Sequence, residues 1–482
     1  MSGSKKKFYI TTTLPYVNAE PHIGFALEII QADVIARYHR QQGDDIFFNT
    51  GTDEHGLKVF RKAQEENVEP QVYCNICAKR YEGLKRALNL SYNSFIRTTD
   101  PHHIKAAQEF WRRCDKNGDI YKKDYKIKYC VGCELEKTES ELVEGRCPIH
   151  PEEKLEIIQE ENYFFRYSRY QDKLLELYRK NPQFVLPEFR LNEIKSFTKR
   201  GLKDFSISRL KEKMPWGIPV PGDDKHVMAV WFDALVNYIS SLGWPYDLKK
   251  FNDFWPGIQV AGKDNLRQQS SMWQAMLMSA GLPTSKQIFI HGFITVGGQK
   301  MSKSLGNVID PFELVKKYGT DAVRYFLLRE IPPTEDGDFT YEKFEKRYNS
   351  DLAQGLGNLV ARVITLATKL KISAFAKASA GKQNKKLNEI IEKSRENYSE
   401  ALDNFKFNEA LKSIWDLISF CDRYIEKERP WENIEKKQST IYNLQSTILN
   451  IAEMLKPFLP ETSEKILKQI ETQKSELLFP RL

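Results

Sequence analysis

The sequence lacks long apolar runs, and this absence excludes one large class of proteins. Its 482 residues contain no stretch of about 18 consecutive apolar residues, the length that a membrane-spanning helix requires. The first ten residues include lysines but no apolar segment of signal-peptide length. We therefore expect a cytoplasmic protein that does not associate with membranes.

Cysteine is also scarce. The seven cysteines are an odd number in a chain of this size, which argues against a disulfide framework and for thiols or metal ligands. Cys130, Cys133, Cys147 and His150 follow the spacing C-x2-C-x13-C-x2-H. Two close ligand pairs separated by a loop suit a tetrahedral Zn2+ ion, and three thiolates with one imidazole complete its coordination. The pattern predicts one structural zinc ion.

The other four cysteines lack this arrangement. Cys74 and Cys77 share the C-x2-C spacing, but they lie in a helical pattern without a second pair, so we interpret them as structural. Cys114 and Cys421 are interpreted as buried thiols.

Composition indicates a soluble globular protein. Hydrophobic residues make up 41% and charged residues 29% of the chain, which are ordinary values for this class. The length corresponds to roughly two to four domains. The net charge of +8 mildly favours a polyanionic partner.

The N-terminal region predicts the start of an α/β domain. Residues 8–14 are β-branched, aromatic and apolar, which predicts a strand, and residues 18–38 turn into an amphipathic helix. This order places His22 and Gly24 near a helix N-terminus, where backbone N–H groups favour a phosphate. The alternative for a lone histidine is a structural side chain in the core.

A second predicted strand, residues 45–50, leads to Asp53. A carboxylate at the carboxyl end of a parallel strand lies where open α/β sheets bind ligands, so Asp53 can pair with a substrate ammonium. A helix N-cap is the alternative. Strands and helices alternate to about residue 114, which predicts half of a doubly wound domain.

Two lysines lie three residues apart in a loop rich in glycine and serine, residues 297–307. Glycines let this backbone bend close to a ligand, and the ammonium groups of Lys300 and Lys303 suit a polyphosphate whose charge shifts during reaction. An isolated K-x-x-K is usually only a solvated loop, so other motifs must support this interpretation.

These motifs resemble a known family. K-M-S-K-S at 300–304 is similar to the second signature of class I aminoacyl-tRNA synthetases, and H-I-G-F at 22–25 resembles the first. Thr13–Asn18, T-L-P-Y-V-N, and Thr52–Gly56, T-D-E-H-G, resemble the bacterial methionyl-tRNA synthetases. The resemblance covers nearly the whole chain.

The resemblance implies the fold and its division. We expect an α/β protein, with a Rossmann-type doubly wound parallel sheet split by a zinc-knuckle insertion and followed by an α-helical bundle. The expected parts are the first catalytic half, the insertion, the second catalytic half with the lysine loop, and the helical anticodon-binding domain: 1–114, 115–225, 226–345 and 346–482.

It also implies a reaction without a protein nucleophile. ATP and L-methionine would form methionyl-adenylate, and the methionyl group would pass to tRNA(Met), with Mg2+ accompanying ATP. The residues implied in catalysis are His22, Lys300, Lys303 and Asp53. Those implied in ATP binding are His22, Gly24, Gly262, Asp264, Ile294, Lys300 and Lys303. Those implied in methionine binding are Leu14, Tyr16, Asp53, Trp231, Ala234, Tyr238 and Gln269. Those implied in anticodon binding are Asn358, Arg362 and Trp431.

The later segments carry further structural expectations. Residues 155–225 are expected to be mostly charged helical material, and the parallel sheet is expected to resume at residues 226–238. Residues 257–261 predict another strand, and residues 287–296 predict the strand that leads to the lysine loop. Trp231, Ala234 and Tyr238 could alternatively be ordinary core, as could Trp431. From about residue 345 the pattern indicates long helices.

The chain departs from the family pattern at three places. Phe25 replaces the second histidine of the first signature, and Leu235 stands where the family often has proline. Gln268 and Gln269 occupy the place of a Phe-His pair near the methionine side chain.

Several rival functions are weaker. The insertion is too short for the editing domain of the isoleucyl, valyl and leucyl enzymes. A cysteinyl enzyme would have zinc ligands spread across its catalytic domain. A non-catalytic tRNA-binding relative would be favoured by loss of the lysine loop, which is intact. A nucleotidyltransferase would not explain the helical C-terminal part. With the chain ending at Leu482, we expect no appended dimerising module, and a monomer.

Overall fold

The computed structural model describes residues 5–137, 141–301, 306–369, 385–432 and 434–482. The chain divides into two compact units by its internal contacts. Unit 1 comprises Met1–Pro21, Gln42–Lys85 and Ser91–Ile290, and unit 2 comprises His22–Gln41, Arg86–Leu90 and His291–Leu482. The division into four parts expected from the resemblance stays a prediction.

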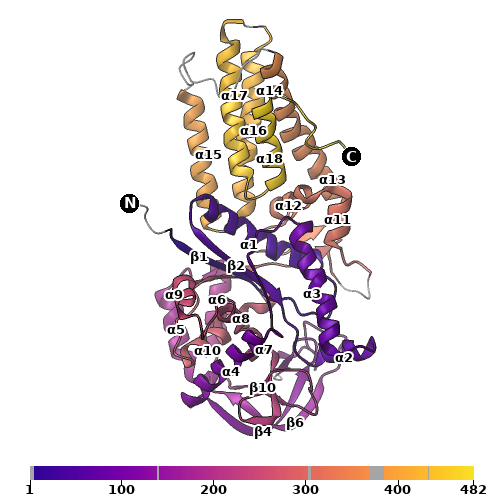
Figure 1. The fold of residues 1–482 in the computed structure, drawn as a ribbon, viewed down its shortest axis with the longest axis vertical. Helices are drawn as coiled ribbons and strands as arrows, with labels where there is room; N and C mark the ends of the chain where they lie inside the picture. Colours follow the sequence, from indigo (N-terminus) through magenta and orange to yellow (C-terminus); the bar gives the residue numbers. More distant parts are fainter. Residues whose placement is uncertain (1–4, 138–140, 302–305, 370–384, 433) are drawn as a thin grey trace. The chain divides into compact units, whose positions relative to one another are not determined.

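Unit 1 is built on a six-stranded sheet with the order β3-β2-β1-β12-β13-β7. Its strands are β1 Lys7–Thr12, β2 Asp45–Thr52, β3 Ser94–Arg97, β12 Ile258–Gly262, β13 Gln287–His291 and β7 Val185–Leu186. β1 pairs in parallel with β2 on one side and with β12 on the other. The strand order therefore reverses at β1, and the carboxyl ends of β1 and β12 lie where such sheets bind ligands. The α/β, doubly wound fold is confirmed (Figure 1).

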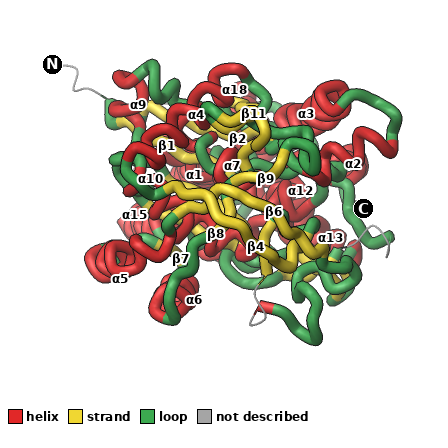
Figure 2. The backbone as a smooth tube through the Cα atoms, turned by 90° about the horizontal axis from the view of Figure 1, so that it is seen from below, coloured by secondary structure: helices red, strands yellow, loops and turns green. Residues whose placement is uncertain are grey.

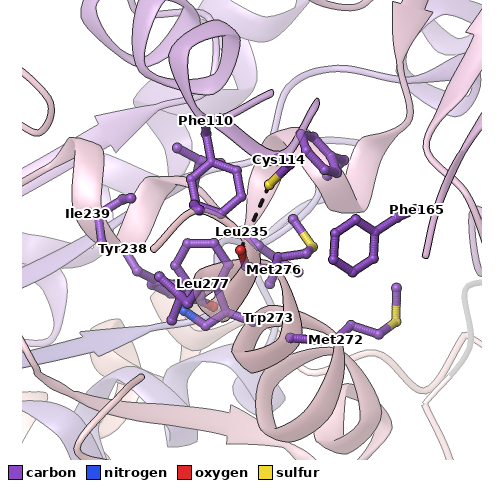
Figure 3. Close-up of a cluster of buried hydrophobic side chains, with 14 of the residues drawn as sticks. Phe110, Cys114, Phe165, Leu235, Tyr238, Ile239, Met272, Trp273, Met276 and Leu277 are labelled. Atoms are coloured by element: carbon purple, nitrogen blue, oxygen red, sulfur yellow. Dashed lines mark hydrogen bonds between the residues drawn. The ribbon is translucent and has the colours of Figure 1, made fainter. Parts of the chain in front are cut away.

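The interior beside this sheet is aromatic. Phe110 from α4 (Pro101–Lys116) stacks on Trp273 from α10 (Trp273–Ser279), with ring centroids 5.4 Å apart. Tyr238 from α8 (Asn237–Ser240) lies against the same tryptophan. The thiol of Cys114 points at the Met276 carbonyl in this cluster (Figure 3). Such rings bury large apolar areas, which supplies much of the stabilisation of a core.

The prediction of helical material at residues 155–225 is wrong in part. β6 (Glu156–Phe165) is a ten-residue strand that pairs antiparallel along β4 (Ile120–Cys130), and both are drawn together in Figure 2. The segment also contains the two helices α5 (Gln171–Lys180) and α6 (Glu188–Lys199) and the strand β7. The period-two pattern is hidden because apolar Ile157 is exposed on one face of β6, whereas polar Glu160 and Asn162 are buried on the other.

The parallel sheet also resumes later than residue 226. β11 (Asp223–Met228) pairs antiparallel with β9 (Ser208–Leu210) and with β10 (Pro219–Val220) in a separate small sheet. β12 is the strand that returns to the main sheet. All five residues of β12 are buried, whereas β11 begins with exposed charged residues, and central parallel strands need apolar surfaces on both faces.

Unit 2 is mostly helical. It contains α1 (Ile23–Gln41) and α12 (Thr320–Arg329), which are joined by the buried ion pair between Arg324 and Asp33, 2.9 Å. Arg324 also donates to the carbonyls of Leu88, Pro457 and Phe458, so each of its three nitrogens has a partner inside the core. The later helices form the predicted bundle (Figure 1): α14 Asn358–Lys369, α15 Lys385–Asp403, α16 Phe407–Glu428, α17 Ile434–Leu455 and α18 Pro460–Thr472.

The predicted strand at residues 287–296 is interrupted. β13 belongs to the main sheet, whereas β14 (Ile294–Val296) pairs with β15 (Gln299–Lys300) and β16 (Gly337–Phe339). Gly292 lies at the break, where a Cβ would stand 2.1 Å from the Glu335 carbonyl oxygen. Only glycine fits this close approach of two backbone segments.

The predictions for the cysteines outside the zinc pattern are confirmed. Cys74 and Cys77 are buried in α3 (Pro70–Ala87), and Cys421 is buried in α16. None of the described helices combines the length and apolarity needed to cross a membrane.

Candidate active site

The first signature is built at the start of α1, in unit 2. The Gly24 N–H donates to Nδ1 of His22 over 3.0 Å. A Cβ at Gly24 would stand 2.8 Å from Cε1 of that ring, so the motif requires glycine for the close approach. Burial lowers the pKa of His22, which favours the neutral imidazole. Because Nδ1 accepts a hydrogen bond, the neutral ring carries its hydrogen on Nε2, as a donor.

The second signature lies in the same unit. Lys300 is exposed at the end of the β14–β15 hairpin, and Ile294 is buried at its beginning. The hairpin turns through Gly297 and Gly298, which both have positive φ. A Cβ at Gly24 would lie 3.5 Å from Cε of Met301, so the structure brings the two signatures together. Lys303 falls outside the described residues.

In unit 1, Asp53 follows β2 and bridges the chain after β1. Its N–H donates to the Pro15 carbonyl, and its carbonyl accepts from Val17. The side chain is 7% exposed, and its Oδ1 has no hydrogen-bond partner. Burial, together with the charges of Asp233 and Glu134, raises the pKa of Asp53 well above its usual range. A cation placed against Oδ1 would relieve both the desolvation and the repulsion.

Glu134 is a second buried carboxylate near this position. It accepts hydrogen bonds from the hydroxyl of Tyr16 at 3.0 Å, from the hydroxyl of Tyr129, and from the N–H of Lys58. Burial raises the pKa of Glu134 and of Tyr16. Tyr16, expected from the sequence, is therefore held by an acid that sequence reasoning missed.

The four predicted zinc ligands do come together. Their ligand atoms all lie within 4.8 Å of one another, and Sγ of Cys133 is 3.5 Å from Sγ of Cys147 and 3.3 Å from Nδ1 of His150. A tetrahedral ion with Zn–S bonds of about 2.3 Å spaces its sulfur ligands about 3.8 Å apart, so the donor set and spacing fit zinc. Hydrogen bonding to Cys133 lowers the pKa of the Cys130 thiol, which favours a thiolate ligand.

The knuckle contacts the predicted methionine residues. The carbonyl of Cys133 accepts from Nε1 of Trp231 at 3.3 Å, and Glu134 follows Cys133 in the chain. Trp231, Arg209 and Glu134 line one pocket together with Ala229, Phe232 and Met272. Loss of the knuckle would therefore free Trp231 and Glu134, which line this pocket, from the positions they now hold.

The side-chain residues of the predicted methionine site lie on consecutive short helices. Trp231 is partly exposed and Ala234 is buried on α7 (Val230–Ala234), and Tyr238 is buried on α8. Leu14 is partly buried just after β1. Nε2 of Gln269 donates to the Tyr238 hydroxyl at 2.6 Å, which connects these two expected residues directly.

A buried His–Asp–His group supports α7. The carboxylate of Asp233 contacts Nδ1 of His55 at 2.7 Å and Nε2 of His103 at 2.8 Å. Burial acts to raise the pKa of Asp233, but the two imidazoles hold it below its ordinary value. Because Asp233 lies between Trp231 and Ala234, this group fixes the segment that carries both.

The expected ribose residues lie at the end of β12. Gly262 is its last residue, and Asp264 stands in the short helical turn Lys263–Asn265. This is the carboxyl end of the strand beside β1, at the reversal of strand order.

The expected anticodon residues lie in the helical part of unit 2. Asn358 begins α14, and Arg362 follows four residues later on the same face. Arg362 pairs with Glu426 at 2.6 Å and lies 3.7 Å from Asp422, both on α16. Trp431 is 47% exposed shortly after α16 ends, so the alternative of a core tryptophan is wrong.

The residues that sequence reasoning missed are mostly buried acids and their partners: Glu134, Asp233, His55, His103 and Tyr129. His55 and His103 are bonded to Asp233 across 178 and 130 positions, and Glu134 is bonded to Tyr16 across 118, so local spacing does not relate them; only Tyr129 and Glu134 are close in the sequence. Two signals were usable: Glu134 directly follows a predicted zinc ligand, and His55 belongs to the T-D-E-H-G motif.

Comparisons with known proteins agree with this geometry. The family model described as tRNA synthetases class I (M) matches residues 8–156 and 141–364, and the anticodon-binding domain of tRNA ligase matches residues 384–480. The methionine–tRNA ligase of Thermotoga maritima is 44% identical over 474 residues, covering 96% of this chain and 75% of the relative. That of Thermosynechococcus vestitus is 42% identical and covers 96% and 90%.

A solved structure is similar throughout. The Mycobacterium tuberculosis methionyl-tRNA synthetase in complex with methionyl-adenylate matches with a TM-score of 0.91 and 37% identity, covering 99% of this chain and 100% of that one. Taken with the two signatures and the buried acidic site, these matches show that the chain belongs to the methionine–tRNA ligase family of class I aminoacyl-tRNA synthetases.

Proposed function

We propose that the chain activates L-methionine with ATP and transfers the methionyl group to the terminal adenosine of tRNA(Met). The observation that carries this proposal is the buried carboxylate of Asp53, whose Oδ1 has no partner. Burial of an unpaired acid is costly, and such a group is retained where a ligand supplies the missing charge. The ammonium group of an amino acid would do so.

At the nucleotide, the protein supplies position and charge. The carboxylate oxygen of methionine attacks the α-phosphorus of ATP, and the bond to pyrophosphate breaks, so no covalent enzyme intermediate forms. The Nε2–H of His22 would donate to a phosphate oxygen on which charge grows, with Lys300 and Lys303 stabilising the triphosphate. Gly24, Gly262, Asp264 and Ile294 would hold the rest of ATP.

Mg2+ would enter with ATP. Within the described part of the chain, the knuckle is the one group of three or more cysteine, histidine or acidic side chains arranged to hold a metal. Bound to the triphosphate, the ion would neutralise part of its charge.

The methionine side chain would lie among Leu14, Tyr16, Trp231, Ala234, Tyr238 and Gln269. Aromatic faces and a polarizable thioether attract one another, and Trp231 and Tyr238 would provide these faces. The partial exposure of Trp231 and the burial of Tyr238 support a pocket with one wall open to a ligand.

Cys130, Cys133, Cys147 and His150 would hold one Zn2+ in a structural role. A closed set of four protein ligands has no position left for substrate or water. The hydrogen bond from Trp231 to Cys133 supports a role in maintaining the pocket wall.

Asn358, Arg362 and Trp431 would read the anticodon of tRNA(Met). Single-stranded bases stack on exposed aromatic rings and form hydrogen bonds through their free edges. The exposure of Trp431 supports this role.

Aminoacylation of tRNA(Met) with methionine tests this proposal. Purified protein given ATP, Mg2+, labelled methionine and tRNA(Met) should form acid-precipitable methionyl-tRNA, and omission of ATP should abolish it. Absence of charging with an intact fold would contradict the proposal.

Three further predictions remain: a monomer, a cytoplasmic location and the four-part domain division. Size-exclusion chromatography with light scattering tests whether the protein is a monomer.

A further inference from the structure

The hairpin that carries Lys300 is bonded at its turn to a carboxylate from a neighbouring strand. β14 and β15 form this hairpin, and β16 pairs in parallel with β14, with Asp338 beside Thr295. Oδ1 of Asp338 accepts from the Gly298 N–H over 2.7 Å and from the Thr295 hydroxyl over 2.9 Å. All four residues belong to unit 2. One carboxylate oxygen therefore joins the turn of the hairpin to its first strand.

The turn itself has little else to restrain it. Gly297 and Gly298 both have positive φ, 59° and 77°, and glycine has no side chain that would favour this conformation over others. The Gly297 N–H donates to the Phe339 carbonyl over 3.3 Å, at the long end of the range for such bonds. Hydrogen bonds to a carboxylate are shorter and stronger than those between neutral groups. The bond from Gly298 to Asp338 is therefore the stronger of these two restraints on the turn.

The carboxylate of Asp338 is held in place from its other side. Its Oδ2 lies 3.4 Å from Nζ of Lys343 on α13 (Tyr341–Arg347). Burial acts to raise the pKa of Asp338, but the hydrogen bonds from Gly298, Thr295 and Lys343 together hold it below its ordinary value. The group is therefore ionised at neutral pH, as a strong acceptor for the turn requires.

The restrained turn lies directly before Lys300. β15 consists of Gln299 and Lys300 alone, so the direction of this short strand depends on the turn that precedes it. Lys300 is also the pairing partner of Thr295, the residue whose hydroxyl Asp338 binds. A change in the turn would therefore displace the backbone of Lys300.

We propose that Asp338 is a positioning residue for ATP, which holds the hairpin so that the Lys300 ammonium meets the triphosphate. The inference rests on the proposed function, which places the triphosphate at Lys300. The carboxylate is bonded to the hairpin and to α13, so it acts through the lysine rather than on the substrate. Displacement of a binding group by about 1 Å can cost about a hundredfold in rate, so one bond to the turn can matter for the reaction.

Removal of the acceptor tests this role. Asp338→Ala should lower single-turnover adenylate formation about ten- to a hundredfold and raise KM for ATP, with little change in KM for methionine. Asp338→Asn keeps an acceptor oxygen for the Gly298 N–H and should recover most of the rate. An Asp338→Ala protein that forms adenylate at the parent rate would overturn the inference, as would one whose KM for methionine rises as much as its KM for ATP.

A double-mutant cycle separates positioning from folding. If Asp338 acts through Lys300, Asp338→Ala should cost little further rate in a Lys300→Ala background, whereas an additive loss would contradict the inference. Asp247→Ala is the matched control, because Asp247 also accepts a backbone N–H, from Lys250 over 3.0 Å, at the start of a helix in unit 1. Its effect on adenylate formation should be small and equal in both backgrounds.

A second variant keeps the test open if Asp338→Ala does not fold. Thr295→Val removes one of the two donors to the same carboxylate oxygen. It should lose rate in the parent but not in Lys300→Ala, and any other result is equally contradictory.

The proposed function fails separately. A parent protein that forms no methionyl-adenylate contradicts the proposed activity. A parent that forms it, with an Asp338→Ala protein that forms it equally fast, contradicts only this inference.

Discussion

The proposed amino-acid residues of unit 1 and the proposed phosphate and RNA residues of unit 2 differ in their contact with water. Asp53, Tyr238 and Gln269 are buried, whereas Lys300 and Trp431 are exposed. A site that selects a small, largely apolar amino acid must exclude water, because polar recognition is stronger where the dielectric constant is low. A site for polyanions or single-stranded bases can stay solvated until its ligand arrives.

This difference has a consequence for mutagenesis. In unit 1 the functional groups are part of the core, so their substitution changes both activity and folding stability. In unit 2 the exposed groups can be removed with little effect on folding, since surface substitutions usually change stability by less than about 0.5 kcal/mol.

The largest effect is expected at Asp53. Asp53→Asn should reduce methionine-dependent exchange about a thousandfold, since a substrate ammonium would lose its buried charged partner. Exposed Asp124→Asn on β4 is the control and should leave exchange unchanged.

Asp53→Asn should also raise the free energy of unfolding. Such a result would show that the carboxylate needed for activity destabilises the core. The pKa of Asp53 is raised in the folded state, so its contribution to stability is fully present below the unfolded pKa and is lost as pH rises through the folded pKa. At neutral pH, Asp53→Asn should therefore have a larger free energy of unfolding than the parent in urea titrations. A less stable Asp53→Asn protein would contradict the raised pKa.

His22 comes next. One preorganised donor to a developing oxyanion is worth about 100- to 1,000-fold in rate, so His22→Ala should lose that much single-turnover adenylate formation, and Lys303→Ala a similar amount. Phe25→Ala, which removes no donor, should lose much less. His39→Ala near the end of α1 serves as the matched histidine control. Adenylate formation at the parent rate in His22→Ala would remove the histidine from the mechanism.

Substitution of Trp431 tests whether tRNA recognition depends on unit 2 while amino-acid activation does not depend on this residue. Loss of a stacking aromatic costs about 1–3 kcal/mol per base, so Trp431→Ala should lower tRNA charging about ten- to a hundredfold and leave exchange intact. Tyr246→Ala, at a 70% exposed aromatic of unit 1, is the control. A parallel fall in both activities would mean that Trp431 acts on folding rather than on tRNA.

Loss of a zinc ligand should have the smallest expected effect, measured on the rate of pyrophosphate exchange. Cys130→Ser should lose the one zinc ion per chain measured by elemental analysis, and exchange should fall about tenfold because the Cys133 carbonyl no longer orients Trp231. Cys74→Ser, at a buried thiol of α3, should keep its zinc. Full zinc content in Cys130→Ser would exclude this ligand set.

The contrast between the units also explains what could be predicted from the sequence. His22, Gly24 and the four knuckle residues belong to short motifs, and their neighbours in space are mostly neighbours in the chain. The parallel strands were predictable where apolar residues cluster, as in β1, β2 and β12.

The elements and site residues that were not predicted depend on pairing between residues far apart in the sequence. β6 was missed because its polar residues Glu160 and Asn162 are buried and its apolar residue Ile157 is exposed. β11 was assigned to the wrong sheet because its pairing partners leave no local pattern in the sequence. Glu134 is bonded to Tyr16 across 118 positions, and Asp233 is bonded to His55 across 178, so only the folded arrangement relates these residues.

The central claim is that the buried site of unit 1 selects methionine. ATP–pyrophosphate exchange with each of the twenty amino acids, measured on the parent and on Asp53→Asn, tests it most directly. Methionine alone should support fast exchange in the parent, and Asp53→Asn should lower this exchange about a thousandfold. Fastest exchange with cysteine or isoleucine, or an Asp53→Asn protein as active as the parent, would contradict it.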